Sequence, residues 1–315
     1  MKNGVISLGE ALIDFIPMDE WNTLYQKSPG GAPANVAVGL SRLGINTYFL
    51  GKLGEDVLGT FLYETLQQYG VKTDHLYLTD EARTGAVFVT LDKSGERSFN
   101  FYINPSADQF LHPDEIDERL FEQAKVLHFG SITLINEPAR SATLKAIKLA
   151  KKHSLRITFD PNVRLPLWPT EKQARETILH TISHADVVKI SEDELEFLTG
   201  ETEEAKGTAA LDKYQIPVLV ITKGEHGSTI ITKNGQVDIE AESVKAVDTT
   251  GAGDAYLSGL LYHVHKYDDK IEDISLQQWQ EAAAFASLSG GLAASAKGAM
   301  SSLPTLKEIE KNKDT

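Results

Sequence analysis

The sequence predicts an α/β fold in which a mainly parallel sheet lies between two layers of helices. Short apolar, β-rich runs alternate along the chain with stretches whose apolar residues recur at helical spacing, which is typical of a parallel sheet with crossover helices. Most positions of these runs are apolar and few polar residues alternate with them, as expected for strands that are buried on both faces. A length of 315 residues allows one large domain of this kind, with at most a small appendage.

The individual elements follow from these runs. Buried strands are predicted at residues 5–8, 47–51, 126–129, 156–159, 187–190 and 218–222. Helices are predicted at residues 34–43, 57–69, 139–153, 171–182, 192–198, 205–214 and 255–264. A hairpin is expected at 228–232 and 237–241, and the charged tail at 307–315 is expected to fray. In such sheets ligands bind beyond the carboxyl ends of the strands, so functional residues are expected there.

Two stretches break the alternation and predict a small additional β structure. Residues 11–17 extend the first strand, and residues 84–91 and 97–103 flank a polar turn that is typical of a hairpin. An isolated hairpin is marginally stable, so this one must pack on the main domain or on a second copy of itself. We expect residues 1–315 to form one domain, with a small β lid made of residues 11–17 and 84–103.

The composition and the missing motifs exclude several classes of function. A net charge of −14 argues against a nucleic-acid partner, because polyphosphate repels an acidic surface. The lack of cysteine excludes disulfides, thiolate zinc sites and cysteine nucleophiles. There is no P-loop, no Rossmann glycine fingerprint and no G-x-S-x-G. The first residues lack the apolar core of a signal peptide and no stretch is long enough to span a bilayer, so we expect a cytoplasmic protein without a membrane partner.

The run DTTGAGD at residues 248–254 is the most informative motif, and an apolar helical stretch follows it. Gly251, Ala252 and Gly253 leave backbone N–H groups uncovered at a helix N-terminus, where the partial positive charge favours an anion. Asp254 places a carboxylate beside that site, which is useful if the carboxylate takes a proton from a hydroxyl while the N–H groups hold a phosphoryl group. The alternative is a glycine turn with Asp254 in the first helical turn, but the length of the run favours the functional interpretation.

A second glycine cluster, GGAPANVAVGLSRLG, occupies residues 30–44. A bulky side chain at Gly30 or Gly31 would block the close approach of a ligand. Asn35 offers a donor and an acceptor, which suits a sugar diol, although tight packing with Asn35 as a local cap is an equal alternative. Asp14 has apolar neighbours and is costly to bury unless it is hydrogen-bonded, so it either binds two sugar hydroxyls or lies on the surface at the start of the lid.

Further polar residues follow the predicted strands. Arg164 could clamp a phosphate, because its guanidinium group matches phosphate oxygens, or it could brace its loop by pairing with Asp160 or Asn162. Thr222 and Gly224 could lie against a nucleotide, or they could simply begin a hairpin. The sequence around Arg164, Thr222 and Gly224 does not decide between ligand binding and a structural role.

Ser191 and Glu194 also have two interpretations. Ser191 matches a helix N-cap with Glu194 at the third helical position, which is a capping box. In the functional interpretation, Glu194 lies near a hydrated magnesium ion. Both remain open from the residues alone.

Taken together, the clusters at 30–44 and 248–254 resemble the two signatures of the PfkB, or ribokinase-like, family of carbohydrate kinases. The resemblance extends from Gly9 to Pro304, and the Gly9-Glu10 start and the Pro105-Ser106-Ala107-Asp108 segment look like bacterial fructokinases. It implies a ribokinase-like three-layer α/β/α sandwich with a small β lid.

The resemblance also implies roles for individual residues. Asp254 would be the catalytic base, and the N–H groups of Gly251, Ala252 and Gly253 would form the anion hole. The sugar would be bound by Asp14, Gly30, Gly31, Asn35, Phe101 and Arg164. The nucleotide would be bordered by Lys189, Thr222, Gly224 and Gly227, and Glu194 would hold Mg²⁺ through water. A monovalent cation would be held by Asp248, Thr250, Ala293, Ala296, Gly298 and Ser302. Many members have Asn where this chain has Ser191, which leaves the role of Ser191 open.

The implied activity is the ATP-dependent phosphorylation of the 6-hydroxyl of fructose to fructose 6-phosphate, with ATP, Mg²⁺ and K⁺ as cofactors. Ribose and 2-keto-3-deoxygluconate are alternative substrates, and a catalytically silent sugar-binding regulator is an alternative function. Kinases of the sugar acid carry an Arg in the lid where this chain has Ile103, which disfavours that substrate. The expected partners are therefore the sugar and ATP, together with a second copy of the chain, because a hairpin with two apolar faces favours lid-to-lid dimerisation.

Overall fold

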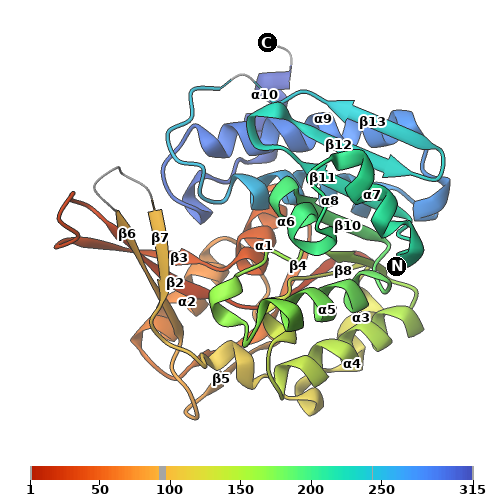
Figure 1. Cartoon of the computed structure of the whole chain (residues 1–315). Helices are drawn as coiled ribbons and strands as arrows, with labels where there is room; N and C mark the ends of the chain where they lie inside the picture. Colours follow the sequence, from red (N-terminus) through yellow and green to blue (C-terminus); the bar gives the residue numbers. More distant parts are fainter. Residues whose placement is uncertain (1, 92–96, 243, 314–315) are drawn as a thin grey trace.

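The computed structural model describes residues 2–91, 97–242 and 244–313. In their order across the main sheet (Figure 1), the strands are β13 (Gly235–Ile239), β12 (Ser228–Thr232), β11 (Val218–Thr222), β10 (Val187–Ser191), β9 (Arg156–Phe159), β8 (Val126–Phe129), β1 (Val5–Leu8), β4 (Thr47–Gly54) and β5 (Leu76–Thr79). Neighbouring strands from β11 to β5 pair in parallel, and β12 and β13 form an antiparallel hairpin at one edge. The predicted mainly parallel sheet is confirmed.

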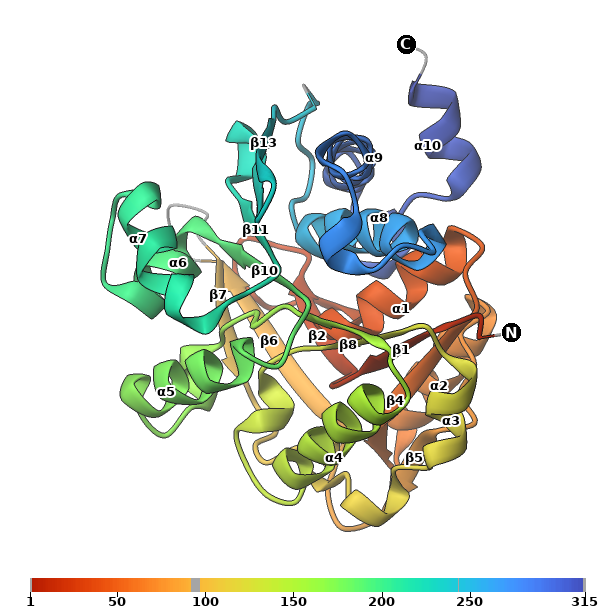
Figure 2. The ribbon, with the colours of Figure 1, turned by 90° about the vertical axis from the view of Figure 1, so that its right-hand side faces the viewer.

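Helices cover both faces of this sheet, so the predicted three-layer arrangement is confirmed as well (Figure 2). Successive residues of a strand point to opposite faces, so Val187 and Val188 of β10 pack in two different cores. The core that contains Val187 lies beneath α1 (Ala32–Arg42), α8 (Ala252–Lys266) and α9 (Leu276–Ala294). The core that contains Val188 lies beneath α3 (Glu118–Gln123), α4 (Ala139–Lys152), α5 (Glu171–Ile182), α6 (Glu192–Thr199) and α7 (Glu204–Leu211).

A second, four-stranded sheet projects from the main body, beside α2 (Val57–Gln68) (Figure 1). Its strands lie in the order β3 (Tyr25–Gly30), β2 (Leu12–Pro17), β6 (Gly85–Leu91) and β7 (Arg97–Phe101). The sequence pattern did not predict β3, because its residues are polar and include Pro29, which a sheet tolerates at an edge. The predicted turn at 92–96 lies outside the described residues.

Several helices escaped the sequence pattern. The pattern missed α3 and α9, and the expectation of a fraying tail is wrong for α10 (Leu306–Lys313). Ile309 anchors α10 in the core beside α9, and the N–H and hydroxyl groups of Thr305 donate to Glu308 at the start of the helix, both at 2.7 Å. Across the described ranges, no helix is long and apolar enough to cross a membrane.

Close packing of α1 against α8 brings the beginnings of these two helices together. A Cβ at Gly39 of α1 would clash with the hydroxyl of Ser258 on α8, so only glycine permits this approach. The Ser258 hydroxyl lies 2.7 Å from the carbonyl oxygen of Asp254 and 3.4 Å from that of Val36. The first turns of both helices therefore face the same space beyond the carboxyl ends of the strands.

Candidate active site

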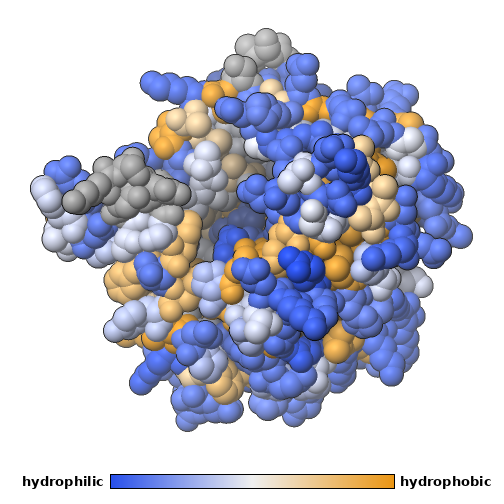
Figure 3. All heavy atoms as spheres, viewed as in Figure 1, coloured by the Kyte–Doolittle hydropathy of each residue, from blue (hydrophilic) through white to orange (hydrophobic). Residues whose placement is uncertain are grey.

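A cavity of about 640 Å³ opens between the small sheet and the carboxyl ends of the main strands (Figure 3). The small sheet contributes Leu12, Asp14, Val87, Phe99 and Phe101. The loops after the strands of the main sheet and the beginnings of the helices contribute Glu10, Gly31, Ala32, Asn35, Ile132, Asn162, Val163, Arg164, Lys189, Ser191, Asp193, Glu194, Thr249, Thr250, Gly251, Gly253 and Asp254. The cavity thus occupies the position where parallel sheets bind ligands.

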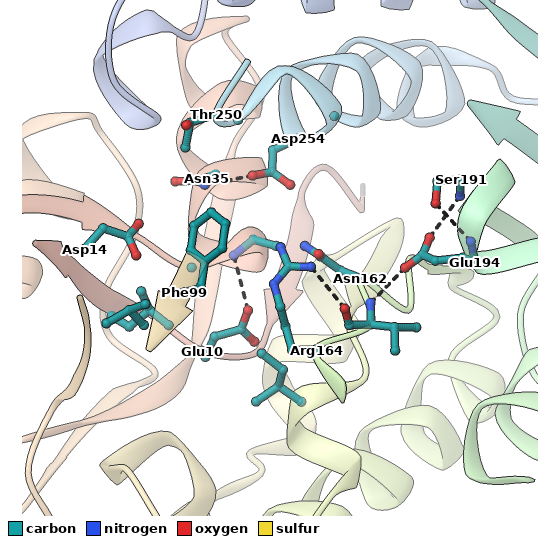
Figure 4. A pocket seen from close by; sticks show the side chains of 18 of the residues that line it. Glu10, Asp14, Asn35, Phe99, Asn162, Arg164, Ser191, Glu194, Thr250 and Asp254 are labelled. Atoms are coloured by element: carbon teal, nitrogen blue, oxygen red, sulfur yellow. Dashed lines mark hydrogen bonds between the residues drawn. The ribbon is translucent and has the colours of Figure 1, made fainter. Parts of the chain in front are cut away.

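Asp254 lies in the first turn of α8, directly opposite Asn35 of α1 (Figure 4). The Asn35 Nδ2 atom donates to Asp254 Oδ2 at 2.7 Å, so Asn35 contacts another helix and is not a local cap. The Asn35 Oδ1 atom is buried and has no hydrogen-bond partner in the described part of the chain. An amide oxygen in this state is ready to accept a hydrogen bond from a ligand hydroxyl.

Burial raises the pKa of Asp254 to about 7. The hydrogen bond from Asn35 opposes this rise, the negative charge of Asp160 adds to it, and Lys189 and Arg164 oppose it. The carboxyl group can therefore accept or release a proton near neutral pH, which is what a general base requires.

The start of α8 offers an anion site beside Asp254. Gly251 adopts a left-handed conformation with φ of 79° and N-caps the helix, and both Gly251 and Gly253 line the cavity. Ala252 is not among the described lining residues, and its N–H group already donates to the carbonyl oxygen of Thr249 at 3.1 Å. The anion site implied from the sequence is therefore narrowed to Gly251 and Gly253.

Two cations face this anion site. Lys189 of β10 is buried and donates to Asp160 Oδ2 at 2.9 Å. Burial alone would lower the pKa of Lys189, but the carboxylates of Asp160 and Glu194 raise it above its usual value, so the ammonium group stays charged. Arg164 is exposed in the cavity, and its Nη1 atom donates to the carbonyl oxygen of Val163 at 3.2 Å. Among the described residues it bonds to neither Asp160, which pairs with Lys189, nor Asn162, so the suggested side-chain brace is wrong.

Glu194 fastens two strand-end loops to each other. Ser191 N–H donates to Glu194 Oε2 at 2.9 Å and Glu194 N–H donates to the Ser191 hydroxyl at 3.2 Å, so the capping box is confirmed. The other carboxylate oxygen accepts a hydrogen bond from Val163 N–H at 2.8 Å, which ties the loop that carries Arg164 to the start of α6 (Figure 4).

Two carboxylates of the cavity would fit a magnesium ion that also binds a phosphate ligand. No cluster of three or more His, Asp, Glu or Cys side chains that could hold a metal occurs among the described residues. The carboxylates of Asp193 and Glu194 nevertheless line the same end of the cavity. One or two carboxylates together with phosphate oxygens is the ligand set that Mg²⁺ takes in nucleotide sites.

Asp14 and Gly30 form the opposite wall, on the small sheet. Burial raises the pKa of Asp14 to about 6, although the nearby charge of Arg164 opposes the rise. A Cβ at Gly30 would clash with the Asp14 carboxylate, so Gly30 makes room for this side chain and is not itself among the described lining residues. Gly31 and Phe101 do line the cavity, as the sequence interpretation expected of sugar-contacting residues.

Three residues expected at a nucleotide are not among the described lining residues of the cavity. Thr222 pairs with Ser191 in the register of β10 and β11, so it lies next to the cavity's edge. Gly224 and Gly227 lie farther along the same connection, in the hairpin entry. A Cβ at Gly227 would clash with the carbonyl oxygen of Ile239, so a structural reason for this glycine is sufficient.

The residues expected to hold a monovalent cation come together from two loops. Asp248 Oδ1 accepts a hydrogen bond from Thr250 N–H at 3.0 Å, and Oδ2 accepts one from Gly298 N–H at 3.1 Å. The N–H group of Asp248 donates to the carbonyl oxygen of Ala294, beside Ala293 and Ala296. Ser302 bonds instead to the carbonyl oxygen of Ala299. The atoms here that could ligate a cation are carboxylate and carbonyl oxygens, which suit a hard cation.

The sequence interpretation missed several residues that line the cavity. Glu10 follows β1, so the strand-end rule that identified Arg164 also applies to it. Asn162 occupies a left-handed conformation with φ of 42° in the loop after β9, a feature of the backbone that the sequence does not reveal. Phe99 lies on the hairpin, where the alternating pattern does not say which face is turned toward the cavity.

Known proteins of similar sequence and structure match this chain over nearly its whole length. Residues 2–306 match the pfkB family carbohydrate kinase. The chain is 42% identical to probable fructokinase-4 of Arabidopsis thaliana over 315 residues, which covers 98% of this chain and 96% of that protein.

Two solved structures are similar in three dimensions. A fructokinase double mutant from Vibrio cholerae O395, bound to fructose, ADP and potassium ion, has a TM-score of 0.91 and 39% identity, covering 98% of this chain and 97% of the other. Aminoimidazole riboside kinase from Salmonella enterica, complexed with aminoimidazole riboside and an ATP analogue, has a TM-score of 0.88 and 31% identity, covering 99% and 100%.

The raised pKa of Asp254 predicts that its charge destabilises the fold. The carboxyl group has an ordinary pKa of 3.8 and a folded-state pKa of about 7. The loss of folding free energy caused by its ionisation is therefore absent below pH 3.8, grows up to about pH 7 and is constant above that pH. We expect Asp254→Asn to stabilise the protein at pH 8 by on the order of 2 kcal/mol, with water in the cavity allowed for, and to change little at pH 3.5.

Thermal unfolding of wild type and variant across this range measures the effect. Asp193→Asn is the matched control, because Asp193 lines the same cavity but is exposed, and it should show no comparable pH-dependent gain. An equal gain for Asp254→Asn at all pH values would contradict the assignment of the shift to burial.

Proposed function

The chain belongs to the pfkB family of carbohydrate kinases, and within that family we propose that it transfers the γ-phosphoryl group of ATP to the 6-hydroxyl of fructose. The products are fructose 6-phosphate and ADP. One observation carries the proposal: Asp254, with its raised pKa, lies between the anion site at the start of α8 and the polar groups of Asp14 and Asn35, in one cavity. The similarity to fructokinases over nearly the whole chain supports fructose as the acceptor.

The sugar occupies the half of the cavity beside the small sheet. Asp14 and the free oxygen of Asn35 accept hydrogen bonds from its hydroxyl groups, and Gly31 lets the ring approach the backbone. Phe99 and Phe101 cover the apolar side of the ring. The small sheet, made of β2, β3, β6 and β7, is the lid expected from residues 11–17 and 84–103, and it closes over the sugar and excludes water from the reaction.

The reaction proceeds by transfer of one proton and one phosphoryl group. Asp254 takes the proton from the 6-hydroxyl as that oxygen forms a bond to the γ-phosphorus of ATP. The bond from the γ-phosphorus to the bridging oxygen breaks, and ADP leaves with that oxygen. Gly251 and Gly253 at the start of α8, with Lys189 and Arg164, stabilise the negative charge on the phosphoryl group during transfer.

The nucleotide occupies the other half, toward α6. Lys189 lines this half, and Asp193 and Glu194, which also line it, would hold Mg²⁺ through water. Thr222, Gly224 and Gly227 lie outside the described lining of the cavity, so they would border the nucleotide only where it extends past the cavity's edge. When bound with ATP, Mg²⁺ supplies neutralisation of the phosphate charges. Potassium would be held beside the start of α8 by the Asp248 loop and the 293–302 segment, where its charge supports the same anion site.

The charges in the cavity favour a neutral acceptor. The positive charge of Arg164 offsets only part of the negative charge of Glu10, Asp14 and Asp254, so acids outnumber cations there, which disfavours a substrate carboxylate. Ile103, at the position where acid-specific kinases carry Arg, adds no cation. A sugar acid such as 2-keto-3-deoxygluconate is therefore disfavoured, whereas ribose and a riboside are the competing neutral acceptors.

ADP release with a panel of acceptors tests the proposal. We expect turnover with fructose to exceed that with ribose, 2-keto-3-deoxygluconate and aminoimidazole riboside. Asp254→Ala should lower kcat by at least about 10²-fold, because a general base typically contributes 10²–10⁴, with little change in fructose affinity. Asp212→Ala, on the exposed surface, is the control and should leave kcat unchanged.

The outcomes separate the alternatives. Turnover with ribose but not fructose would refute the substrate assignment. No turnover with any acceptor would favour a silent sugar-binding regulator. Normal turnover by Asp254→Ala would remove the base assignment while leaving the family unchanged.

We also propose that two copies of the chain pair through their small sheets, and that the enzyme acts in the cytoplasm, with no nucleic-acid or membrane partner. Large apolar side chains are exposed at the tip of this sheet, where Trp21 is 75%, Leu24 is 64% and Met18 is 60% exposed. On the same sheet, the rings of Phe15 and Phe88 stack with their centroids 4.8 Å apart. A cluster of large, exposed apolar side chains is typical of a protein–protein interface.

Light scattering at micromolar concentration tests the dimer. The wild type should have twice the mass of the 34.6 kDa chain, and Leu24→Lys should shift it toward the monomer because a charge cannot be buried there without a partner. Leu144→Lys is the matched control on α4, since Leu144 is also exposed but lies on the main body. A monomeric wild type would refute the dimer.

A further inference from the structure

Two buried acidic residues lie in the connections between the main sheet and the small sheet. Glu10 lies in the first crossing, between β1 and β2, and Asp108 follows the last, in the turn Ala107–Phe110 after β7. Each side chain is only 4% exposed. An acid is rarely buried to this extent unless it is paired or hydrogen-bonded, so the two together need a physical explanation.

Glu10 and Asp108 line the same small cavity beneath the sugar half of the main cavity. Its volume is about 10 Å³, which is room for about one water molecule. Ser106 and Gln109 line it as well, so a water there would have several polar neighbours. The rest of its lining is Leu12, Gly85, Ala86, Val87, Phe101, Ile103, Ile132 and Leu167, most of it from the small sheet.

The hydrogen bonds of this acid pair are incomplete. Glu10 Oε1 accepts from the N–H of Ala32, at the start of α1, at 3.2 Å, and Asp108 Oδ1 accepts from the Ser106 hydroxyl at 2.5 Å. Asp108 Oδ2 is buried and lacks a hydrogen-bond partner among the described residues. A buried carboxylate oxygen without a donor is unfavourable, and a proton on the Glu10 carboxyl group, passed through one water in the small cavity, would supply that donor.

The surroundings favour one proton on the pair. Burial, with the neighbouring charge of Asp108 in addition, raises the pKa of Glu10 to about 8, and burial raises that of Asp108 to about 6. The charged groups that act on Glu10 are Asp108, which adds to the rise, and Arg164, which opposes it. Glu10 and Arg164 both line the main cavity (Figure 4). The other described residues around the small cavity carry no charge. Between these pH values the pair therefore binds one proton as a unit.

We propose that Glu10 and Asp108 act as one acid pair, sharing a proton and a water molecule, that fastens the small sheet to the main sheet in the position that binds sugar. Both are positioning residues, because the pair joins the first and last crossings directly beneath Leu12, Val87 and Phe101, which also line the sugar half of the main cavity. When the proton is lost, two negative charges face each other in a buried space and push the crossings apart. The inference rests on the proposed function only in taking fructose as the sugar.

Calorimetric titration with fructose tests the effect on binding. From pH 8 to pH 9.5 we expect wild-type affinity to fall about tenfold as the pair loses its proton. Glu10→Gln and Asp108→Asn each remove one of the two facing charges, so neither should show this alkaline loss. Glu310→Gln, at an exposed site on α10, should behave as the wild type. The carboxyls of Asp14 and Asp254, with pKa values of about 6 and 7, are already ionised in this range and do not contribute.

Thermal unfolding without ligand gives a second measurement that does not depend on which sugar binds. The pKa of Glu10 is 4.5 ordinarily and about 8 in the folded state, so its stability cost develops between these values. The melting temperature of Glu10→Gln minus that of the wild type should therefore rise from pH 4.5 to pH 8 and then level off.

A melting-temperature difference that does not change with pH, or an alkaline loss of fructose affinity in Glu10→Gln equal to the wild type's, would overturn the acid pair. If the wild type binds no fructose but the melting-temperature difference rises as expected, the substrate assignment fails and the acid pair stands. If Glu10→Gln does not fold, Asp108→Asn carries both measurements.

Discussion

The hydrogen bond between Asn35 and Asp254 is the interaction on which the site depends. It joins the first turns of α1 and α8, two helices far apart in the chain, and it exists because Gly39 and Ser258 allow these helices to pack closely. The same hydrogen bond orients the Asp254 carboxylate, whose pKa is raised by burial. It also leaves the amide oxygen of Asn35 free for a sugar hydroxyl. In the proposed reaction the base, the acceptor hydroxyl and the anion site would therefore share one small volume.

The charges around this volume are costly to the fold and useful to the reaction. Glu10, Asp14 and Asp254 all have raised pKa values, so the cavity holds carboxyl groups that would be more stable in water. Lys189 and Arg164 offset part of that cost, and Lys189 itself is held by Asp160. Cations and helix N–H groups lie where we propose that the phosphoryl group binds, and hydrogen-bond acceptors lie where we propose that the sugar binds. This separation directs a neutral polyol and a polyphosphate to different ends.

The sequence was sufficient for the parallel sheet, its covering helices and most of the cavity, because continuous apolar runs mark buried strands and ligands bind where such strands end. It was insufficient where tertiary contacts overrule local pattern. The polar strand β3 forms because an edge accepts Pro29, and α10 forms because Ile309 is buried in the core and Leu306 packs against it. The partner of Asp160 proved to be Lys189, from another strand, and no local spacing predicts such a pairing.

The central claim is that Asp254 is the base and that its surroundings set its basicity. The dependence of kcat on pH at saturating ATP, for wild type and Asn35→Leu, tests it most directly. The wild-type rate should fall about tenfold per pH unit below about pH 7. Removing the hydrogen bond that lowers the pKa of Asp254, with the branching of the side chain kept, should move this acid limb to higher pH. A wild-type rate that is constant down to pH 5, or an acid limb that Asn35→Leu leaves in place, would contradict the account.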